Sequence, residues 1–596
     1  MGKKKKKEKQ LFLRLNLLFL LTFVLFSALI FRLGLIQIVQ GEEFVQQAER
    51  NTQRTIEGTA PRGYFLDRHY REIVTNEHMY TLTFTRQREL ESRKVEIAQK
   101  LSALIDMDAK EILAKMEEGI FLTPHRIKTN LTPEEMARVA EHLDQLPGVE
   151  IMVDSERNYV YDGVLDTLLG SVGSITAENR DYYLSRGYRL NEQVGRSGLE
   201  LQYEEQLRGV PSESIITVDR TQRIIDHPIE IPGRRGNDLV LTIDVEFQQA
   251  IEEIIAKEIE TNPDIPKDKP AEQPLFVALN PKTGEILGMS NNVFTYKVGS
   301  YVPGSTVKMA TVLAGLHEGI VTPHTVINDR PITIGRQTFR SWKTLGSVDA
   351  VRALQLSSNI YMINIGLKMA GSYSSDAVSR AQDQLREYYA QFGLGVPTGI
   401  DLPGESAGQI FDSADYHLPG RLAHLTFGQL DQYTPLQLAQ YAATIANGGY
   451  RMQPYLVKEI RRGTAEDDGI GEVIWRKEPR VLNRIEMSEE HLRTVQRGME
   501  AVTAPGGTAY GMFGDFPVKV AAKTGTAQTE RPYNHTLLVG YAPADDPEIA
   551  FATLVPYSQR AQTQTQSPAQ RITKEILSVY FGLEKNGEED NGEETE

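Results

Sequence analysis

A run of lysines followed by a long apolar segment limits what this chain can fold into more than any other feature of the sequence. Lys3 to Lys7 and Lys9 precede the segment from Leu11 to Leu35, which is almost wholly apolar. Within it, Leu15 to Phe31 gives 17 residues without a charge, and long flanking side chains extend the span because their charged ends reach the bilayer interface. We therefore predict a transmembrane anchor over residues 11–35.

The lysines also predict how the anchor is oriented. Positively charged residues beside an apolar helix stay in the cytoplasm, so residues 1–10 form a cytoplasmic basic segment and everything after Phe31 lies outside. A cleaved signal peptide is the alternative, but its apolar region is normally shorter, and no small-residue cleavage site follows here. The predicted localisation is the cell membrane, with a single pass and a large extracytoplasmic body.

Composition narrows the function of that body. The net charge is −15, which is the wrong sign for the basic surface that nucleic-acid binding needs. The absence of cysteine excludes disulfides, thiol catalysis and cysteine-ligated zinc. The 11 histidines include no His-x-x-x-His pair. We expect no nucleic-acid partner, no metal site and no cofactor.

The body divides into a mixed pedestal at 36–236, a larger domain at 237–582 and a tail. The pedestal begins with a polar stretch, 36–60, that we expect to form a helical stalk, after which strand-like runs alternate with helical patterns. One helix start is well marked, since Thr132 fits the N-cap, Pro133 the first helical position and Glu135 a capping box.

The tail, 583–596, is predicted to be disordered, because residues 584–596 carry seven acids against one lysine. In the larger domain, a turn at 280–284 between two apolar runs is typical of a hairpin. The strands on either side of Ala542 to Pro547 pair antiparallel, since this turn is too short for a helical crossover. The predicted elements are strands at 239–243, 275–279, 285–289, 518–522, 536–541 and 549–555, a helix at 245–259, a loop at 261–274 and a helix at 569–581.

A serine and a lysine stand one turn apart at a predicted helix start. Pro303 and Gly304 form a turn, Ser305 follows it, and Lys308 lies on the same face one turn along. A serine hydroxyl is a poor nucleophile without a base, and a lysine held neutral by burial or by a neighbouring cation can accept its proton. Chance is the alternative, since a chain of this length contains about one Ser-x-x-Lys pattern.

Two further motifs strengthen this interpretation. Ser357-Ser358-Asn359 lies at a predicted loop or helix start. The segment 523–526, Lys-Thr-Gly-Thr, follows a predicted strand. A basic, hydroxyl-rich strand edge suits a substrate that carries a carboxylate, and Gly525 lets the substrate backbone approach closely.

Both triplets have a second copy earlier in the chain. Lys282-Thr283-Gly284 follows Asn280-Pro281 in the predicted hairpin, and Ser290-Asn291-Asn292 comes soon after it. Both copies precede Ser305, so we interpret them as structural turns. The order Ser-x-x-Lys, Ser-x-Asn, Lys-Thr-Gly selects the motifs that begin at 305, 357 and 523.

These three motifs in this order resemble the signature of the penicillin-recognising serine acyl-enzymes. The chain as a whole resembles the class B penicillin-binding proteins, which are bitopic peptidoglycan transpeptidases, from Leu11 to Phe581. Gly428-Gln429-Leu430 departs from the Gly-Gln-Gly that the family often has. Further matching segments are Arg62 to Arg68, Gly195 to Glu200, Asn280 to Ile286, Thr434 to Gln437 and Asn447 to Gly449.

The resemblance implies an α+β multidomain fold: one transmembrane helix, a mixed pedestal and a transpeptidase domain with an antiparallel sheet flanked by helices. It also implies the acylation chemistry. Ser305 attacks the carbonyl between the last two D-alanines of a stem peptide, and Lys308 accepts its proton. Ser357 relays that proton to the leaving amine, while Asn359 holds Lys308 and the substrate amide.

The resemblance also implies how substrate is bound. Lys523 tunes the field around Ser357, and Thr524, Gly525 and Thr526 bind the terminal carboxylate or its β-lactam mimic. The backbone N–H groups of Ser305 and Thr526 form the oxyanion hole. No cofactor is required.

Two other functions remain as alternatives. One is a β-lactamase or carboxypeptidase, for which the anchor and pedestal have no obvious use. The other is a β-lactam sensor or a catalytically silent scaffold, although Ser305 and Lys308 are both retained. The partners implied are peptidoglycan stem peptides and β-lactams. Because no glycosyltransferase module is present, they also include a glycan polymerase of the SEDS type, together with other cell-wall synthesis proteins.

Overall fold

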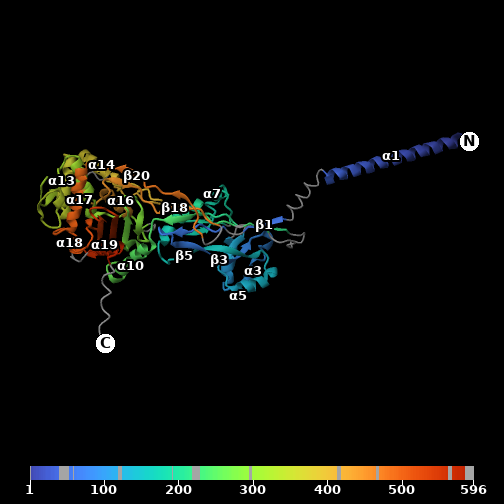
Figure 1. The fold of residues 1–596 in the computed structure, drawn as a ribbon, viewed down its shortest axis with the longest axis horizontal. Coiled ribbons are helices and arrows are strands. Elements are labelled where there is room, and N and C mark those ends of the chain that lie inside the picture. Colours follow the sequence, from blue (N-terminus) through green and yellow to red (C-terminus); the bar gives the residue numbers. More distant parts are fainter. Residues whose placement is uncertain are drawn as a thin grey trace, which may run out of the picture.

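The computed structural model describes residues 2–38, 53–57, 60–118, 124–190, 192–211, 213–217, 229–231, 233–293, 299–411, 418–464, 469–529, 531–560 and 567–583. Figure 1 shows the C-terminal domain at the opposite end of the molecule from helix α1 (Gly2–Ile38), with the pedestal between them. Within α1, the 22 residues Arg14–Leu35 are long and apolar enough to cross a membrane. This agrees with the anchor predicted over residues 11–35.

The predictions for the stalk and the tail have other outcomes than the prediction of the anchor. Strand β1 (Gln53–Glu57) pairs antiparallel with β8 (Glu213–Thr217), so the prediction of a helix is wrong at this end of the stalk. The partner strand lies far along the chain, and no local pattern reveals it. The residues between α1 and β1, and the predicted acidic tail from residue 584 on, lie outside the described residues.

A seven-stranded sheet forms the centre of the pedestal and continues beyond it. Its order is β19-β18-β10-β2-β3-β4, with β5 also paired to β3. Strand β10 runs parallel to β2 and antiparallel to β18, so the sheet crosses the predicted boundary at residue 236. The division at that residue stays a prediction. The strands are β2 (Phe65–Leu66), β3 (Glu72–Thr85), β4 (Pro124–Lys128), β5 (Val149–Tyr159), β10 (Asp238–Leu241), β18 (Val457–Arg461) and β19 (Val473–Arg476).

Three helices pack on the outer part of this sheet: α3 (Lys94–Ser102), α4 (Ala109–Glu118) and α5 (Pro133–Glu141). The predicted capping box is confirmed, since the Thr132 side chain accepts from the Glu135 N–H and the Glu135 carboxylate accepts from the Thr132 N–H. The remaining pedestal elements are α6 (Asp166–Leu169), β6 (Val172–Ser174), α7 (Arg180–Leu184), β7 (Gln193–Gly195), α8 (Gly198–Gln202), α9 (Glu204–Leu207) and β9 (Ile229–Ile231).

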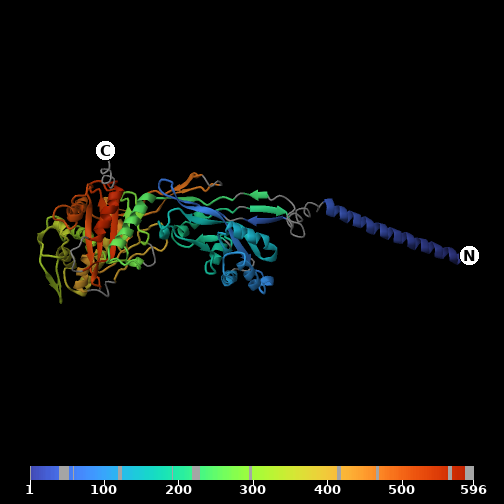
Figure 2. The ribbon, with the colours of Figure 1, turned by 90° about the horizontal axis from the view of Figure 1, so that it is seen from below.

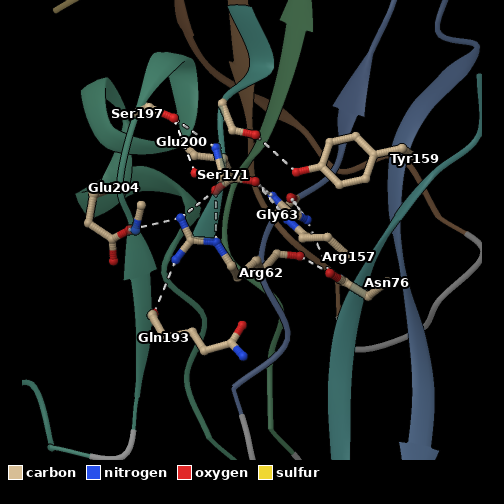
Figure 3. Close-up of polar contacts among 12 residues, drawn as sticks. Arg62, Gly63, Asn76, Arg157, Tyr159, Ser171, Gln193, Ser197, Glu200 and Glu204 are labelled. Carbon is tan, nitrogen blue, oxygen red and sulfur yellow. Dashed lines mark hydrogen bonds and ion pairs between the residues drawn. The ribbon is translucent and has the colours of Figure 1, made fainter. Parts of the chain in front are cut away.

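A buried cluster of charged side chains joins two pedestal segments, Arg62 to Arg68 and Gly195 to Glu200 (Figure 3). Arg62 donates to Glu200 at 2.6 and 2.9 Å and to Glu204 at 2.8 Å. Arg157 donates to the other oxygen of Glu200 at 2.7 Å and to the Gly63 carbonyl at 2.8 Å. The four charged side chains are at most 9% exposed. The cluster therefore fastens α8 and α9 to the start of the sheet.

The C-terminal domain is built on a five-stranded antiparallel sheet in the order β12-β11-β23-β22-β21. Figure 2 shows this sheet with helices on both sides. The predicted hairpin and the antiparallel pairing around 542–547 are confirmed. The strands are β11 (Leu275–Leu279), β12 (Ile286–Met289), β21 (Ala521–Ala527), β22 (Tyr533–Ala542) and β23 (Ile549–Arg560).

The strand predicted at 518–522 is misplaced. Strand β21 begins at Ala521 because pairing with β22 begins there, opposite Tyr541, whereas Val518 and Val520 only pack against the core. As a result, the Lys-Thr-Gly segment lies inside the strand and not after it. Since β21 ends the row of strands, its other edge has no strand partner among the described residues.

Helices cover both faces of this sheet and carry the motifs. On one face α10 (Val245–Thr261) packs against α19 (Pro568–Tyr580), both close to their predicted positions. Asp244 caps α10 by accepting from two backbone N–H groups. The other helices are α11 (Lys308–His317), α12 (Ala350–Gln355), α13 (Asn359–Ala370), α14 (Ser375–Gln391), α15 (Pro419–Thr426), α16 (Pro435–Ala446), α17 (Glu489–Thr503) and α18 (Tyr510–Phe513).

Small two-stranded ribbons complete the domain. They are β13 (Ile327–Asp329) with β16 (Gly346–Val348), β14 (Ile332–Ile334) with β15 (Gln337–Phe339), and β17 (Tyr450–Met452) with β20 (Val481–Arg484). The first ribbon ends beside the start of α13, where the Ser-x-Asn motif lies.

Candidate active site

Ser305 lies in a single turn of 3₁₀ helix, η4 (Gly304–Val307), that leads directly into α11. Gly304 starts the turn with φ +55°, a left-handed conformation that favours glycine. Its N–H donates to the Gly428 carbonyl at 2.8 Å, and a Cβ on Gly428 would lie 2.0 Å from the Gly304 oxygen. Gly428 is therefore required for close packing under the turn, whereas Leu430 is an ordinary core residue.

Lys308 follows one turn later and is fully buried. Its Nζ lies 2.8 Å from the Ser357 carbonyl oxygen, 3.1 Å from the Ser357 hydroxyl and 2.6 Å from the Asn359 side-chain oxygen, all within hydrogen-bond distance. The first and second predicted motifs are thus brought together, with the lysine at the centre.

Ser357 adopts a left-handed backbone conformation, with φ 58°. Its N–H and that of Ser358 close the C-terminal end of α12 by donating to the Leu354 and Ala353 carbonyls. Ser358 then caps α13 by accepting from the Tyr361 N–H. A non-glycine residue in this conformation costs about 1 kcal/mol. In this conformation, both the carbonyl and the hydroxyl oxygen of Ser357 face Lys308.

A buried carboxylate lies behind this motif. Asp329 is 2% exposed and accepts from the hydroxyls of Ser341 at 2.7 Å and Ser358 at 2.5 Å. Ser341 in turn accepts from the Asn359 N–H at 2.9 Å. The sequence reasoning missed this residue, because a lone Asp at the end of a short strand carries no local signal.

The third motif lies on the edge strand β21. Lys523 is fully buried and donates to the Ser357 hydroxyl at 3.0 Å and to the Thr524 carbonyl at 3.0 Å. The Thr524 hydroxyl is 2.9 Å from that of Thr508, a contact that the sequence did not predict. Thr526 and Gly525 face the turn that carries Ser305.

The packing between β21 and η4 is tight. A Cβ on Gly525 would lie 2.8 Å from the Thr306 methyl carbon and 3.0 Å from the Pro303 carbonyl oxygen. A Cβ on Gly304 would lie 2.9 Å from the Thr526 carbonyl oxygen. The backbones of the two segments therefore lie side by side, with the Ser305 turn against residues 525–527.

The two lysines have strongly perturbed proton affinities. Burial lowers the pKa of Lys308 well below its ordinary value, the positive charge of Lys523 lowers it further, and Asp329 acts in the opposite direction. Burial lowers the pKa of Lys523 to about 7. A neutral Lys308 beside a charged Lys523 is the pairing that these directions favour, and it leaves Lys308 able to accept a proton.

The structure also places the two early motif copies and His535. The early motif copies are structural, since Asn280 closes the hairpin turn around Lys282 to Gly284 and the Ser290 hydroxyl accepts from the Phe276 N–H. His535 follows the Lys-Thr-Gly segment in the chain and is not a surface residue. His535 is 5% exposed on β22, and burial lowers its pKa to about 4.

Two aromatic residues of the C-terminal domain, Trp342 and Tyr301, differ in their exposure. Trp342 is 62% exposed, so it is not a core residue. Its indole N–H donates to the Leu356 carbonyl at 2.9 Å, and the Lys343 ammonium lies 4.3 Å from the centroid of its ring. Tyr301 is half-buried, stacks edge-on with His535 and donates to the Ala271 carbonyl.

Comparison with known proteins gives the same arrangement of domains. Residues 57–241 match the penicillin-binding protein dimerisation domain, and residues 275–578 match the penicillin-binding protein transpeptidase domain. The chain is 36% identical to penicillin-binding protein 2A of Bacillus subtilis (strain 168), over 97% of this chain and 94% of that protein. It is 26% identical to the peptidoglycan D,D-transpeptidase MrdA of Escherichia coli (strain K12), over 92% of each.

Solved structures are similar over the same span. Penicillin-binding protein 2B of Streptococcus pneumoniae (strain 5204) has a TM-score of 0.70 at 26% identity, covering 90% of this chain and 100% of that one. A peptidoglycan synthase complex described as coordinating polymerization and crosslinking contains a chain with a TM-score of 0.66 at 25% identity, covering 96% of this chain and 99% of that one. The chain therefore belongs to the class B penicillin-binding proteins, and it is a peptidoglycan D,D-transpeptidase.

Proposed function

We propose that Ser305 is the nucleophile that carries the acyl-enzyme of this transpeptidase, and that the residues of the three motifs divide the proton transfers between them. The observation that carries the proposal is the convergence of Lys308 and Lys523 on the Ser357 hydroxyl, at 3.1 and 3.0 Å. When two lysines are buried side by side, the charge of one favours the neutral form of the other. Lys523 therefore favours a neutral Lys308, which can act as the base for Ser305.

In the proposed acylation, Ser305 Oγ forms a bond to the carbonyl carbon of the penultimate D-alanine. Its proton passes to Lys308 Nζ, and the C–N bond to the terminal D-alanine breaks. The leaving amine takes a proton through the Ser357 hydroxyl, so the protons balance. The backbone N–H groups of Ser305 and Thr526 would hold the developing oxyanion, a contribution of about 3–4 kcal/mol each to the barrier.

The second half of the reaction is the same sequence in reverse. The amine of a neighbouring stem peptide attacks the acyl carbon and gives up a proton, and Ser305 Oγ leaves as the hydroxyl. Charged Lys523 and the hydroxyls of Thr524 and Thr526 would bind the terminal carboxylate of the donor. The open edge of β21 supports this, since an extended peptide can lie along it.

We also propose that the catalytic domain is extracytoplasmic and works beside a glycan polymerase of the SEDS type. The lysines at the N-terminal end of α1 support the first statement through the positive-inside rule. The similarity to a chain of a synthase complex that couples polymerization and crosslinking supports the second. Copurification of the tagged full-length chain with such a polymerase is the check, and its absence would count against the partner.

The experiment for the proposed nucleophile is fluorescent-penicillin labelling of the full-length chain in detergent, parent beside Ser305→Ala. We expect a stable label in the parent and none in the variant. A label that persists in the variant would overturn the role of Ser305. Rapid loss of label from the parent would favour a β-lactamase, and a folded parent that never labels would favour a silent scaffold.

A further inference from the structure

We propose that Asp329 is a positioning residue for acylation, which orients the Ser357–Asn359 turn through two serine hydroxyls and supplies a negative charge behind the lysine pair. This inference rests on the proposed roles of Lys308 and Ser357. It concerns a residue outside the three motifs, at the end of β13.

The hydrogen bonds give Asp329 its first function. A single oxygen of its carboxylate accepts from Ser341 and from Ser358, and Ser341 accepts from the Asn359 N–H. The Ser358 hydroxyl is also the cap of α13. Asp329 therefore fixes the residues on both sides of the peptide that links Ser357 to the helix. A serine held in a left-handed conformation needs such support, because it is strained on its own.

The charge gives Asp329 its second function. The site buries two lysines, while Asp329 is buried among hydroxyls and forms no ion pair with a lysine or arginine in the part of the chain that the structure describes. The charged groups that act on Lys308 are Lys523 and Asp329, and they act in opposite directions. Burying two cations costs less free energy when an anion lies near them. The Asp329 carboxylate therefore limits how far the pKa of Lys308 is lowered.

The two functions predict different changes in the pH profile of acylation. Asp329→Asn keeps acceptor oxygen for the hydroxyls but removes the charge. Loss of the charge lowers the pKa of Lys308 further, so the acid limb of the profile moves down by about one pH unit. The alkaline limb, set by Lys523, stays in place. Ser341→Ala keeps the charge and loses one support of the turn, so the rate falls about 10-fold at every pH without moving either limb.

The test measures the second-order rate constant of acylation by fluorescent penicillin, from pH 4.5 to 9, on full-length protein in detergent. Asp349→Asn is the matched control. This nearby carboxylate caps α12, a role that Asn fills equally well, so we expect the parent profile. Thermal unfolding of each variant checks that it is folded.

The proposal is overturned if folded Asp329→Asn has the parent's acid limb and folded Ser341→Ala has the parent's rate. Should Asp329→Asn fail to fold, Ser341→Ala alone decides the positioning role, and a parent-like rate overturns it. The Ser305→Ala labelling experiment separates this outcome from a failure of the proposed function, because it does not depend on Asp329.

Discussion

The Ser357 hydroxyl lies within hydrogen-bond distance of Lys308 Nζ and Lys523 Nζ, at 3.1 and 3.0 Å. Once Lys308 has taken the proton of Ser305, both ammonium groups donate to this hydroxyl, which fills its two acceptor positions and leaves its own proton to donate elsewhere. That proton is the one available to a leaving amine. The hydrogen bonds of Ser357 therefore determine the direction of proton transfer.

The lysine pair predicts a bell-shaped pH dependence for acylation of the parent enzyme. The rate constant for the free enzyme falls at low pH when Lys308 becomes protonated, and falls at high pH when Lys523 loses its charge. Since burial lowers the pKa of Lys523 to about 7, we expect the alkaline midpoint near pH 7. Stopped-flow or quenched labelling with penicillin measures it. A rate constant that stays level up to pH 9 would contradict this assignment of Lys523.

At the scale of elements, the sequence predicts best those structures whose signals are local. The capping box at Thr132, the hairpin around 280–284 and the pairing across 542–547 all depend on neighbouring residues, and all three are confirmed. The catalytic motifs were found for a similar reason, since their spacing along the chain is their signature. The roles of their residues stay predictions.

Structures that depend on distant partners were missed. β21 begins where β22 offers it a partner, His535 is buried because Tyr301 and Tyr557 close over it, and β1 is a strand because β8 lies beside it. Asp329 belongs to this group as well. Its neighbours in sequence give no sign of the serines that it meets.

The contact between Gly428 and the η4 turn predicts a large effect from one methyl group. Gly428→Ala would place Cβ 2.0 Å from the Gly304 carbonyl oxygen, at φ +80°, so the turn that carries Ser305 must move. We expect acylation to fall about 100-fold. Gly448→Ala is the matched control, because it has φ +64° with nothing within 4 Å, and should cost only about 1 kcal/mol of stability. Equal acylation rates in the two variants would contradict the role given to Gly428.

The charge cluster of the pedestal predicts a large effect on stability. Glu200→Ala leaves Arg62 and Arg157 buried with fewer partners, so we expect a loss of about 3–5 kcal/mol of unfolding free energy. Glu205→Ala is the control, since its carboxylate is 74% exposed and 3.8 Å from Arg186, and should change stability by less than about 1 kcal/mol. Denaturant unfolding of the two proteins gives the comparison, and similar losses would show that the cluster is not what stabilises the pedestal.

At the scale of the whole molecule, the pedestal and the C-terminal domain are joined across the predicted boundary at residue 236. Strand β10 pairs with β2 of the pedestal, and Arg71 binds both Asp67 in the pedestal and Asp244 at the start of α10, at 2.7 and 2.6 Å. Farther along, the Tyr203 hydroxyl donates to the half-buried carboxylate of Asp401 at 2.8 Å. The connection consists of sheet hydrogen bonds and partly buried polar contacts, unlike the exposed linker that usually separates domains.

Because one sheet contains strands of both the pedestal and the C-terminal domain, we expect the two parts to unfold together. If β10 were lost, β2 and β18 would each lose a neighbour, so neither the pedestal nor the C-terminal domain can open alone without exposing unpaired strand edges. We therefore expect one calorimetric transition for the full-length chain in detergent, and we expect Glu200→Ala, although it lies in the pedestal, to lower the temperature at which penicillin labelling is lost. Two resolved transitions, with the labelling temperature unchanged in the variant, would show instead that the parts fold independently and that the sheet is a contact between separate domains.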